Sequence, residues 1–357
     1  MKKTLLAMAV LAASGAAFAQ SSVTLFGVVD GTLAFGKGSV SNLTQLTNSG
    51  YNSSRLGFRG VEDLGGGLNA SFHLEAGVNN DNGTGAATST NNQAVGAFDA
   101  ATGANAPVRA GTQGLTFNRR STVSLGGGFG EVRLGRDYTP QFWNHTVYDP
   151  FGTNGVGTTQ TLNSNIGGPV AVRASNSIGY FLPGNLGGFN GQVQYYMGEN
   201  ASTSAKNGNG ISLRVGYGAG PIAANLAYAN TEYAAGDIKS MNVGASYNFG
   251  VAKVMGMYEN VKNGSVTGKG LLAGVTAPVG AGEIRGSYST YETNAAGTPK
   301  TNKLALGYVH NLSKRTAAYA TFARVKNEGG AKQALNGSST AANGSSTGYD
   351  FGIRHSF

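Results

Sequence analysis

The chemistry open to this sequence is limited first by the absence of cysteine. The 357-residue chain has no thiol nucleophile, thiolate metal ligand or disulfide, because it contains no cysteine. The segment "GSSTG" at 344–348 matches the Gly-x-Ser-x-Gly pattern of serine hydrolases. That pattern acts at a sharp turn from a strand into a helix, whereas this copy lies in a Ser- and Gly-rich tract. We therefore expect no catalytic residue and no enzyme activity.

Metal binding is not indicated either. The four histidines are far apart, and no two of them have the spacing of a zinc site; they are His73, His145, His310 and His355. The Asn-, Asp- and Gly-rich run 79–83 offers oxygen ligands for a hard cation, but polar loops produce such runs by composition alone. We expect no metal and no cofactor.

The N-terminus has the pattern of an export signal. The stretch "MKKTLLAMAVLAASGAAFAQ" begins with two lysines, continues with an apolar run over 5–13 and reaches Ala-Phe-Ala before a glutamine. A membrane-spanning helix needs about 20 apolar residues, and this run is about half as long. The pattern predicts a signal peptide at 1–19, cleaved after Ala19, and one mature domain at 20–357.

The composition excludes some partners. Positive charge can indicate nucleic-acid binding, and the formal net charge here is +9. The Lys and Arg residues, however, are spread along an exported chain, so we expect no nucleic-acid partner. With 58 glycines, 8 prolines and 12% charged residues, the chain is either low-complexity material or a sheet protein with many turns.

Alternation of apolar and polar residues favours the sheet protein. In "SVTLFGVVDGTLAFGK", Leu25, Val29 and Leu33 share one face, and Asp30 and Thr32 share the other. The segments "FNGQVQYYMGE" and "ISLRVGYG" repeat the pattern. A soluble sandwich has the same alternation, so the pattern of one strand does not decide which face is buried.

The connections decide between these architectures. Short turns such as "DLGGG" at 63–67 alternate with long polar loops, notably 80–116, 137–171 and 327–347. This alternation is typical of a closed up-and-down barrel with two unlike ends, as in outer-membrane barrels. We count about sixteen strand segments, an even number that closes such a barrel antiparallel. They start near residues 23, 54, 68, 117, 131, 173, 189, 210, 222, 240, 251, 268, 283, 302, 316 and 348.

The last strand, "YDFGIRHSF", fits a membrane barrel. Tyr349, Phe351, Ile353 and Phe357 would face lipid, while Arg354 would face the lumen. Terminal aromatic residues are typical of the girdle where a barrel meets the membrane surface.

Several blocks together resemble a known family. In order, they are "SSVTLFGVVDGTL", "SRLGFRGVEDLGGGLNASFHLE", "FNRRSTVSLGGGFGEVRLGRDYTP", "RASNSIGY" and "GIRHSF". The chain resembles, over 21–357, the general porins of Gram-negative outer membranes, in particular the trimeric porins of beta-proteobacteria. The most specific block is "RLGFRGVEDLG".

The resemblance implies an all-β fold: a sixteen-stranded antiparallel transmembrane β-barrel with short periplasmic turns, long extracellular loops and a third loop folded into the lumen. It also implies a homotrimer that contacts outer-membrane lipid and lipopolysaccharide. Phe357 would then be the signal read by the outer-membrane assembly machinery.

The third long loop is 137–171. Related porins often carry a Pro-Glu-Phe-Gly acid there, whereas this loop has no Glu, and Asp149 in "YDPFG" is its main candidate acid. The residues expected on the loop side of the constriction are Asp137, Tyr138, Tyr148 and Asp149.

Such porins place a ladder of basic residues on the wall opposite this loop. By alternation Arg55, Arg59, Arg133 and Arg173 face the lumen. In the strand after 117, alternation favours Arg120 and the family alignment favours Arg119, so both stay candidates. Each arginine could instead be a solvated or paired lumen residue; the candidate partners are Glu75, Glu131 and Glu283.

The sequence therefore predicts a general diffusion porin in the outer membrane, a water-filled channel for small hydrophilic solutes and ions, with a preference for small anions. The alternative is a surface-exposed adhesin or structural barrel that uses its long extracellular loops.

Overall fold

The structure is a computed structural model. It describes residues 22–86, 88–94, 107–110, 114–200 and 206–357. The predicted signal peptide, 1–19, and parts of the long loop 80–116 lie outside these described residues.

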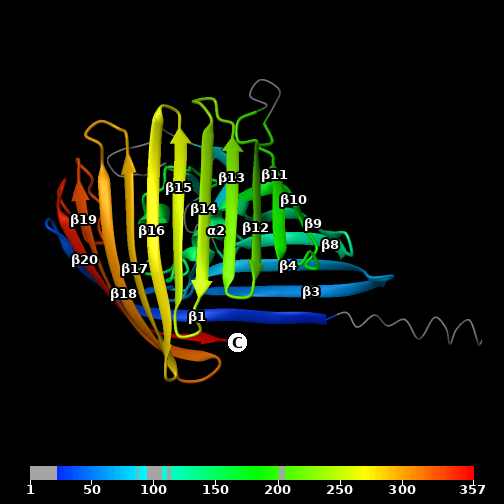
Figure 1. Cartoon of the computed structure of the whole chain (residues 1–357), viewed down its shortest axis with the longest axis horizontal. Helices are drawn as coiled ribbons and strands as arrows, with labels where there is room; N and C mark the ends of the chain where they lie inside the picture. The colour runs from blue at the N-terminus through cyan, green and yellow to red at the C-terminus, as the bar shows by residue number, and fades with distance from the viewer. Residues whose placement is uncertain (1–21, 87, 95–106, 111–113, 201–205) are drawn as a thin grey trace, which may run out of the picture.

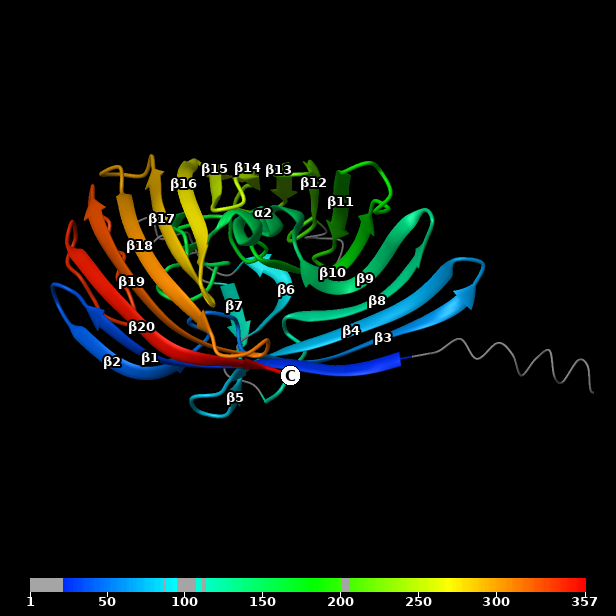
Figure 2. The ribbon, with the colours of Figure 1, turned by 60° about the horizontal axis from the view of Figure 1, so that its bottom comes forward.

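Within the described residues, sixteen antiparallel strands form one closed barrel (Figures 1 and 2). The barrel strands are β1 (Ser22–Lys37), β3 (Arg55–Gly65), β4 (Leu68–Asn79), β8 (Arg120–Gly127), β9 (Gly130–Tyr138), β10 (Arg173–Phe181), β11 (Phe189–Tyr196), β12 (Gly210–Ala219), β13 (Ile222–Thr231), β14 (Ile238–Asn248), β15 (Lys253–Asn263), β16 (Val266–Val279), β17 (Gly282–Thr293), β18 (Lys300–Asn311), β19 (Thr316–Glu328) and β20 (Ser345–Ser356). The predicted strand count and antiparallel order are confirmed.

Four short strands accompany the barrel. β2 (Asn42–Asn48) pairs with the second half of β1, and β5 (Thr84–Gly85) pairs with the end of β4. β6 (Thr88–Ala94) and β7 (Pro107–Ala110) pair with each other in the long connection between β4 and β8.

The barrel closes between its first and last strands. β20 pairs antiparallel with β1 from Val28 opposite Ser356 onward. Phe357 extends this ladder, because its N–H donates to the Gly27 carbonyl at 3.1 Å and its carbonyl accepts from the Gly27 N–H at 3.2 Å. A Cβ at position 27 would overlap its ring and lie 2.9 Å from the Arg55 carbonyl oxygen, so glycine fits there without displacing either group.

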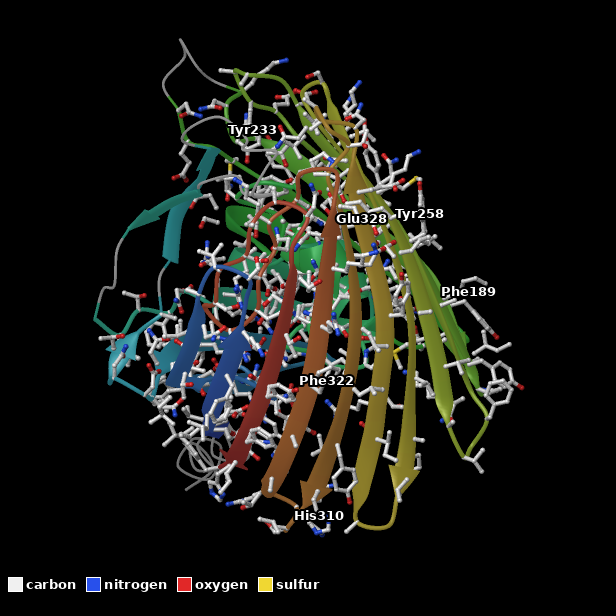
Figure 3. The ribbon with its side chains drawn as sticks, turned by 90° about the vertical axis from the view of Figure 1, so that its left-hand side faces the viewer. Phe189, Tyr233, Tyr258, His310, Phe322 and Glu328 are labelled. Carbon is white, nitrogen blue, oxygen red and sulfur yellow. The ribbon has the colours of Figure 1, made fainter. Side chains whose placement is uncertain are left out.

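The two surfaces of the wall differ as the alternation predicts. Large apolar side chains project outward, as Figure 3 shows for Phe189 and Tyr258. Small polar residues such as Ser212 and Asn242 are buried on the inner side of the same wall. Exposed apolar residues all around a barrel form a band that hydrocarbon can cover, as outer-membrane barrels require.

The third long connection, 139–172, folds into the barrel. It contains two helices, α2 (Pro140–Tyr148) and α3 (Gln160–Asn163). α2 packs against β12, β13 and β14, and α3 packs against β16 and β17, so the loop rests on one side of the lumen (Figure 2). The predicted inward loop is confirmed. No helix in the described residues is long and apolar enough to span a membrane.

Many contacts hold this loop on the wall. Phe151 and Val156 pack with Ala305 and Val325 in a small buried apolar cluster. Polar contacts repeat along the loop, including the buried pair of His145 Nε2 and Glu259 Oε1 at 2.9 Å. The loop position is therefore set by the barrel interior, which leaves the opening on the opposite side of the lumen.

Candidate pore constriction

The lumen narrows between the inward loop and the wall formed by β3, β8, β9 and β10. An opening of 380 Å³ lies there. Its charged lining residues are Arg55, Arg119 and Arg173, all on the wall side. The other lining residues are Asn52, Ser53, Tyr138, Phe142, Trp143, Thr146, Gly152, Thr153, Asn154, Leu162 and Val172.

The three guanidinium groups share two partners. Glu75 Oε1 accepts from Arg119 Nε at 2.5 Å and lies 3.8 Å from Arg55 Nη1. The Tyr138 hydroxyl accepts from Arg119 Nη2 at 2.6 Å and from Arg173 Nη2 at 2.8 Å. Arg173 also lies over the Tyr138 ring, 4.4 Å from its centroid. Within the described residues these three cations have one carboxylate beside them, so the group keeps a net positive charge.

The backbone explains why these arginines reach the opening. Arg55 begins β3, opposite Gly77 of β4, and Arg173 begins β10, opposite Tyr138 of β9. The register of β10 shifts between Ala174 and Ser177, so alternation counted from the far end of β10 does not by itself orient Arg173. Its contacts with Tyr138 are what place it at the opening.

Arg120 and Arg133 form a second group on the same wall. Arg133 Nη1 donates to Asp137 Oδ2 at 2.6 Å, and its Nε and Nη2 donate to the two carboxylate oxygens of Glu131 at 3.0 Å. Arg120 Nε lies 3.7 Å from Asp137 Oδ1. Two arginines and two carboxylates balance here, and neither arginine lines the opening in the described part of the chain.

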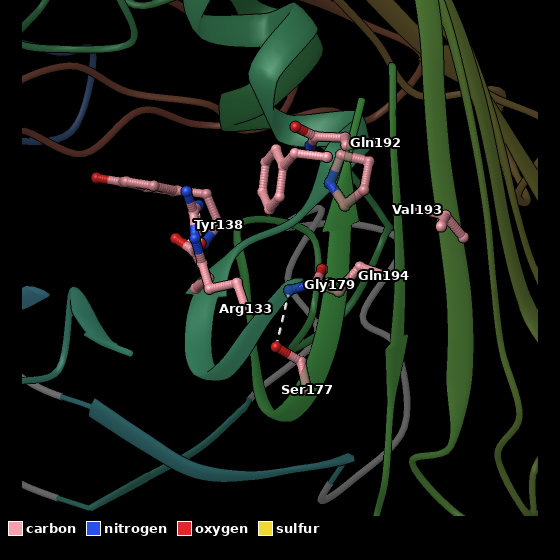
Figure 4. A pocket seen from close by; sticks show the side chains of 10 residues that line it. Arg133, Tyr138, Ser177, Gly179, Gln192, Val193 and Gln194 are labelled. Carbon is pink, nitrogen blue, oxygen red and sulfur yellow. Dashed lines mark hydrogen bonds and ion pairs between the residues drawn. The ribbon is translucent and has the colours of Figure 1, made fainter. Parts of the chain in front are cut away.

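Figure 4 shows the surroundings of Arg133. It lines a cavity of only 10 Å³, in which the Gln194 side-chain amide donates to Ser177 Oγ at 3.0 Å. Val193, next to Gln194 in the chain, projects to the other side of the wall. Such a volume holds about one water molecule, so this cavity is no path for solutes.

The sequence left open whether Arg119 or Arg120 faces the lumen. In the structure both side chains reach the inner side of the wall. Arg119 precedes β8 and joins the group at the opening, whereas Arg120 joins the paired group. Arg59 is exposed and lies over the Phe26 ring, 5.3 Å from its centroid, away from the opening.

Of the residues predicted on the loop side, some line the opening and others are buried. Tyr138 lines the opening, while Asp137 is buried between Arg120 and Arg133. Tyr148 is fully buried and donates to Asn225 Oδ1 at 2.7 Å.

The Asp149 carboxylate is buried among backbone N–H groups of its own loop. Its carboxylate accepts the backbone N–H groups of Phe151 at 2.9 Å, Thr159 at 3.0 Å and Thr153 at 3.2 Å. Burial raises the pKa of Asp149, and these hydrogen bonds and nearby Lys303 oppose the rise. Asp149 thus folds the loop back on itself and does not line the opening.

Sequence reasoning missed the aromatic side of the opening. Phe142 and Trp143 line it from α2, and the Phe142 ring stacks on Tyr138 with centroids 5.1 Å apart. The signal that could have found Trp143 is its status as the only tryptophan of the chain, placed inside the predicted constriction loop.

A further pair of arginines was also missed as a site. Arg285 and Arg354 stack on the Tyr51 ring, at 4.6 Å and 5.2 Å from its centroid. Glu283, a predicted candidate partner, pairs with Arg285 at 2.7 Å. Alternation had placed Arg354 in the lumen, and the same rule applied along β17 could have placed Arg285 beside it.

A closed transmembrane barrel with a loop-narrowed polar lumen defines the class of outer-membrane channel proteins. The chain belongs to the Gram-negative porin family, whose model matches residues 5–330. It is similar to outer membrane porin protein 32 of Delftia acidovorans, with 40% identity over the full length of both chains. It is also similar to an outer membrane porin protein of Bordetella pertussis, with 28% identity over the full length of both.

Among solved structures, it is similar to the anion-selective porin from Comamonas acidovorans. The TM-score is 0.81 at 37% identity, covering 95% of this chain and all of that one. The protein is therefore a general diffusion porin of the outer membrane, and the predicted fold class, function and location are confirmed. The family and these relatives are porins rather than enzymes.

Proposed function

We propose that this porin conducts small anions in preference to cations. The observation that carries the proposal is the charge around the opening, where Arg55, Arg119 and Arg173 gather and Glu75, paired with Arg55 and Arg119, is the one carboxylate among the described residues that contacts them. Three positive charges against one negative charge leave a net charge of +2 at that point. The anion-selective title of the Comamonas relative supports the same assignment.

Fixed charge acts on permeating ions over about a Debye length, roughly 10 Å at 0.1 M salt. Inside a narrow opening that distance spans the path of the ion, so the arginines concentrate anions and repel cations. The loop side adds no opposing charge, because its described lining residues are aromatic, hydroxyl, amide and aliphatic. The preference should therefore fade as salt rises.

The test is the zero-current potential of the wild-type porin in a planar bilayer under a KCl gradient. We expect a chloride preference that is largest below about 0.1 M salt, where screening is weak. A cation preference at low salt would contradict the proposal. A protein that inserts but passes no current would instead favour the adhesin or structural barrel.

We further propose that the exported chain, cleaved after Ala19, assembles as a homotrimer in contact with outer-membrane lipid and lipopolysaccharide. The exposed tyrosines of the described residues support a division of the outer surface, because all lie on β11–β20; they are Tyr195, Tyr217, Tyr228, Tyr247, Tyr288, Tyr308 and Tyr349. Tyrosine is typical of membrane interfaces. The wall from β1 to β9, with Leu33 and Val123 exposed, would then face the other subunits.

Native mass measurement in mild detergent tests the trimer, and a monomer alone would contradict it. Deleting Phe357 should lower the yield of folded trimer, because it removes the residue that completes the ladder with Gly27 and the proposed signal for the assembly machinery. The heat-modifiable band on gels measures this yield. Wild-type yield after the deletion would remove the assembly role.

A further inference from the structure

The helix in the pore loop turns several polar side chains to the wall and two aromatic side chains to the opening. A helix in a water-filled protein normally turns polar residues to water and packs apolar residues inside. α2 instead buries polar side chains against the wall: Gln141 contacts Ser212, Asn144 contacts Asn242, and His145 pairs with Glu259. Two of its three aromatic residues, Phe142 and Trp143, line the opening, while Tyr148 is buried.

Trp143 is the most unusual of these residues. It is only partly buried, and its ring lies edge-on to Tyr138 with centroids 5.4 Å apart. Tyr138 in turn stacks on Phe142 with the ring planes 12° apart. Three aromatic rings thus form one apolar surface beside a path for hydrophilic solutes. Exposing an indole to water is unfavourable, and a permeating solute could cover this surface.

The aromatic surface is continuous with the arginines. Tyr138 belongs to both, because its ring meets Trp143 and Phe142 while its hydroxyl accepts hydrogen bonds from Arg119 and Arg173. All five residues border the same 380 Å³ opening. A solute in this opening can contact a flat apolar surface and a guanidinium group at the same time.

The guanidinium groups have donors to spare. Arginine carries five N–H donors. Within the described part of the chain, the hydrogen bonds of Arg119 and Arg173 use Nε and Nη2 of each side chain. The Nη1 groups therefore remain for a solute, and a carboxylate is the planar acceptor that suits them.

We propose that the constriction is a binding site for aromatic carboxylates, with the carboxylate on Arg119 and Arg173 and the ring against Trp143. This inference rests on the proposed anion preference. It names the class of anion that binds at the constriction. Chloride or acetate contacts only the arginines, and a neutral aromatic molecule contacts only the rings. A benzoate-type anion contacts both and should dwell longer in the opening.

Trp143 supplies a direct readout, because it is the only tryptophan in the sequence. Porin in detergent is titrated with sodium benzoate, with sodium acetate as the control for charge and benzyl alcohol as the control for the ring. We expect saturable quenching of the tryptophan fluorescence by benzoate at concentrations at least about tenfold below those at which either control acts, as expected when two contacts add. Equal responses to the three compounds would overturn the proposal.

Single-channel recording in KCl supplies the second readout. Benzoate should interrupt the chloride current of the wild-type porin, and Trp143→Ala should weaken the interruption by about tenfold, the factor that corresponds to losing one aromatic contact. Val147→Ala is the matched control, because Val147 is exposed on the same helix but does not border the opening. An unchanged benzoate effect in Trp143→Ala would also overturn the proposal.

The wild-type zero-current potential in KCl separates the two proposals. A chloride-preferring pore on which benzoate has no special effect contradicts only the aromatic site. A cation-preferring pore contradicts the proposed function, whatever benzoate does. The wild-type fluorescence titration needs no variant, so it remains decisive if Trp143→Ala folds poorly.

Discussion

The same wall of the barrel holds two groups of arginines in opposite electrostatic states. Around the opening, Arg55 and Arg119 pair with Glu75, and Arg173 has no ion pair within the described residues. A few residues away, Arg120 and Arg133 are matched by Asp137 and Glu131. The first group has an excess of positive charge and the second has none. The number of arginines on a pore wall is therefore a poor measure of the charge that a permeating ion meets.

Strand geometry accounts for the difference. Residues two apart in a strand lie on the same face, so an acid at that spacing can pair with its neighbour. Glu131 pairs with Arg133 in this way, and Glu283 pairs with Arg285. Neither Arg55 nor Arg173 has an acid two positions away in the sequence. Arg120 has none either, but it lies 3.7 Å from Asp137 of the neighbouring strand β9. An acid two positions along the strand or on the adjacent strand thus distinguishes a neutralised arginine from one whose charge acts on the pore.

The largest effect that would test this contrast is on ion selectivity. Arg55→Gln combined with Arg173→Gln removes the excess charge at the opening, because one arginine then faces Glu75. Two unit charges about 4 Å apart in water interact by about 1 kcal/mol, or about fivefold in an equilibrium. We expect the chloride-to-potassium permeability ratio from the zero-current potential to fall by at least about fivefold at low salt.

The matched control for that variant is Arg133→Gln combined with Asp137→Asn. It removes one charge of each sign from the paired group and keeps hydrogen-bonding side chains at both positions. The permeability ratio should stay at the wild-type value. If the control changes selectivity as much as the double arginine variant does, the division into two groups is wrong.

A smaller effect is expected from the acids. Glu75→Gln raises the net charge of the opening from +2 to +3, since Glu75 is the one carboxylate that pairs with Arg55 and Arg119 there. The chloride preference should rise by about two- to threefold at low salt, less than the change from removing two arginines. Zero-current potentials measure this rise.

Glu131→Gln sharpens the same comparison. Arg133 keeps its contact with Asp137 in that variant, and neither residue borders the opening in the described part of the chain. The variant leaves an excess of one positive charge away from the opening, so the chloride preference should change less than in Glu75→Gln. A Glu75→Gln pore with a weaker chloride preference would show that Glu75 serves mainly to hold the arginines in position.

Much of the fold was predictable because a barrel repeats one simple pattern. Alternation and turn spacing predicted all sixteen strands near their observed starts, including β3 at Arg55 and β10 at Arg173. Alternation does not predict which face a residue occupies beyond a bulge or outside a strand. The register shift after Ala174 and the position of Arg119 before β8 are two such places.

The loop was less predictable because its contacts join residues far apart in the sequence. Asp149 was the main candidate acid, but three backbone N–H groups of its own loop surround its carboxylate. The aromatic lining by Trp143 depends on which face of α2 meets the wall, and the hydrogen bond between Asn144 and Asn242, 98 positions apart, helps to fix that face. A sequence pattern within the loop does not contain this information.

The smallest effect concerns Tyr138, which links the arginines without contributing charge. Tyr138→Phe removes the hydroxyl that accepts from Arg119 and Arg173 but keeps the ring on which Arg173 stacks. Hydrogen bonds to charged groups contribute about 1.5–3 kcal/mol each to stability. Water in the opening can hydrate both guanidinium groups, so we expect a loss of only about 1 kcal/mol in the free energy of unfolding.

The control is Tyr180→Phe, which removes one hydrogen bond from an exposed hydroxyl to the Phe129 carbonyl and should change stability less. Because all three charges remain, the chloride preference of Tyr138→Phe should fall by less than about twofold. Urea titration of the heat-modifiable band measures the first quantity and zero-current potentials the second. A large loss of selectivity with unchanged stability would show that the orientation of the arginines, rather than their number in excess of Glu75, sets the ion preference.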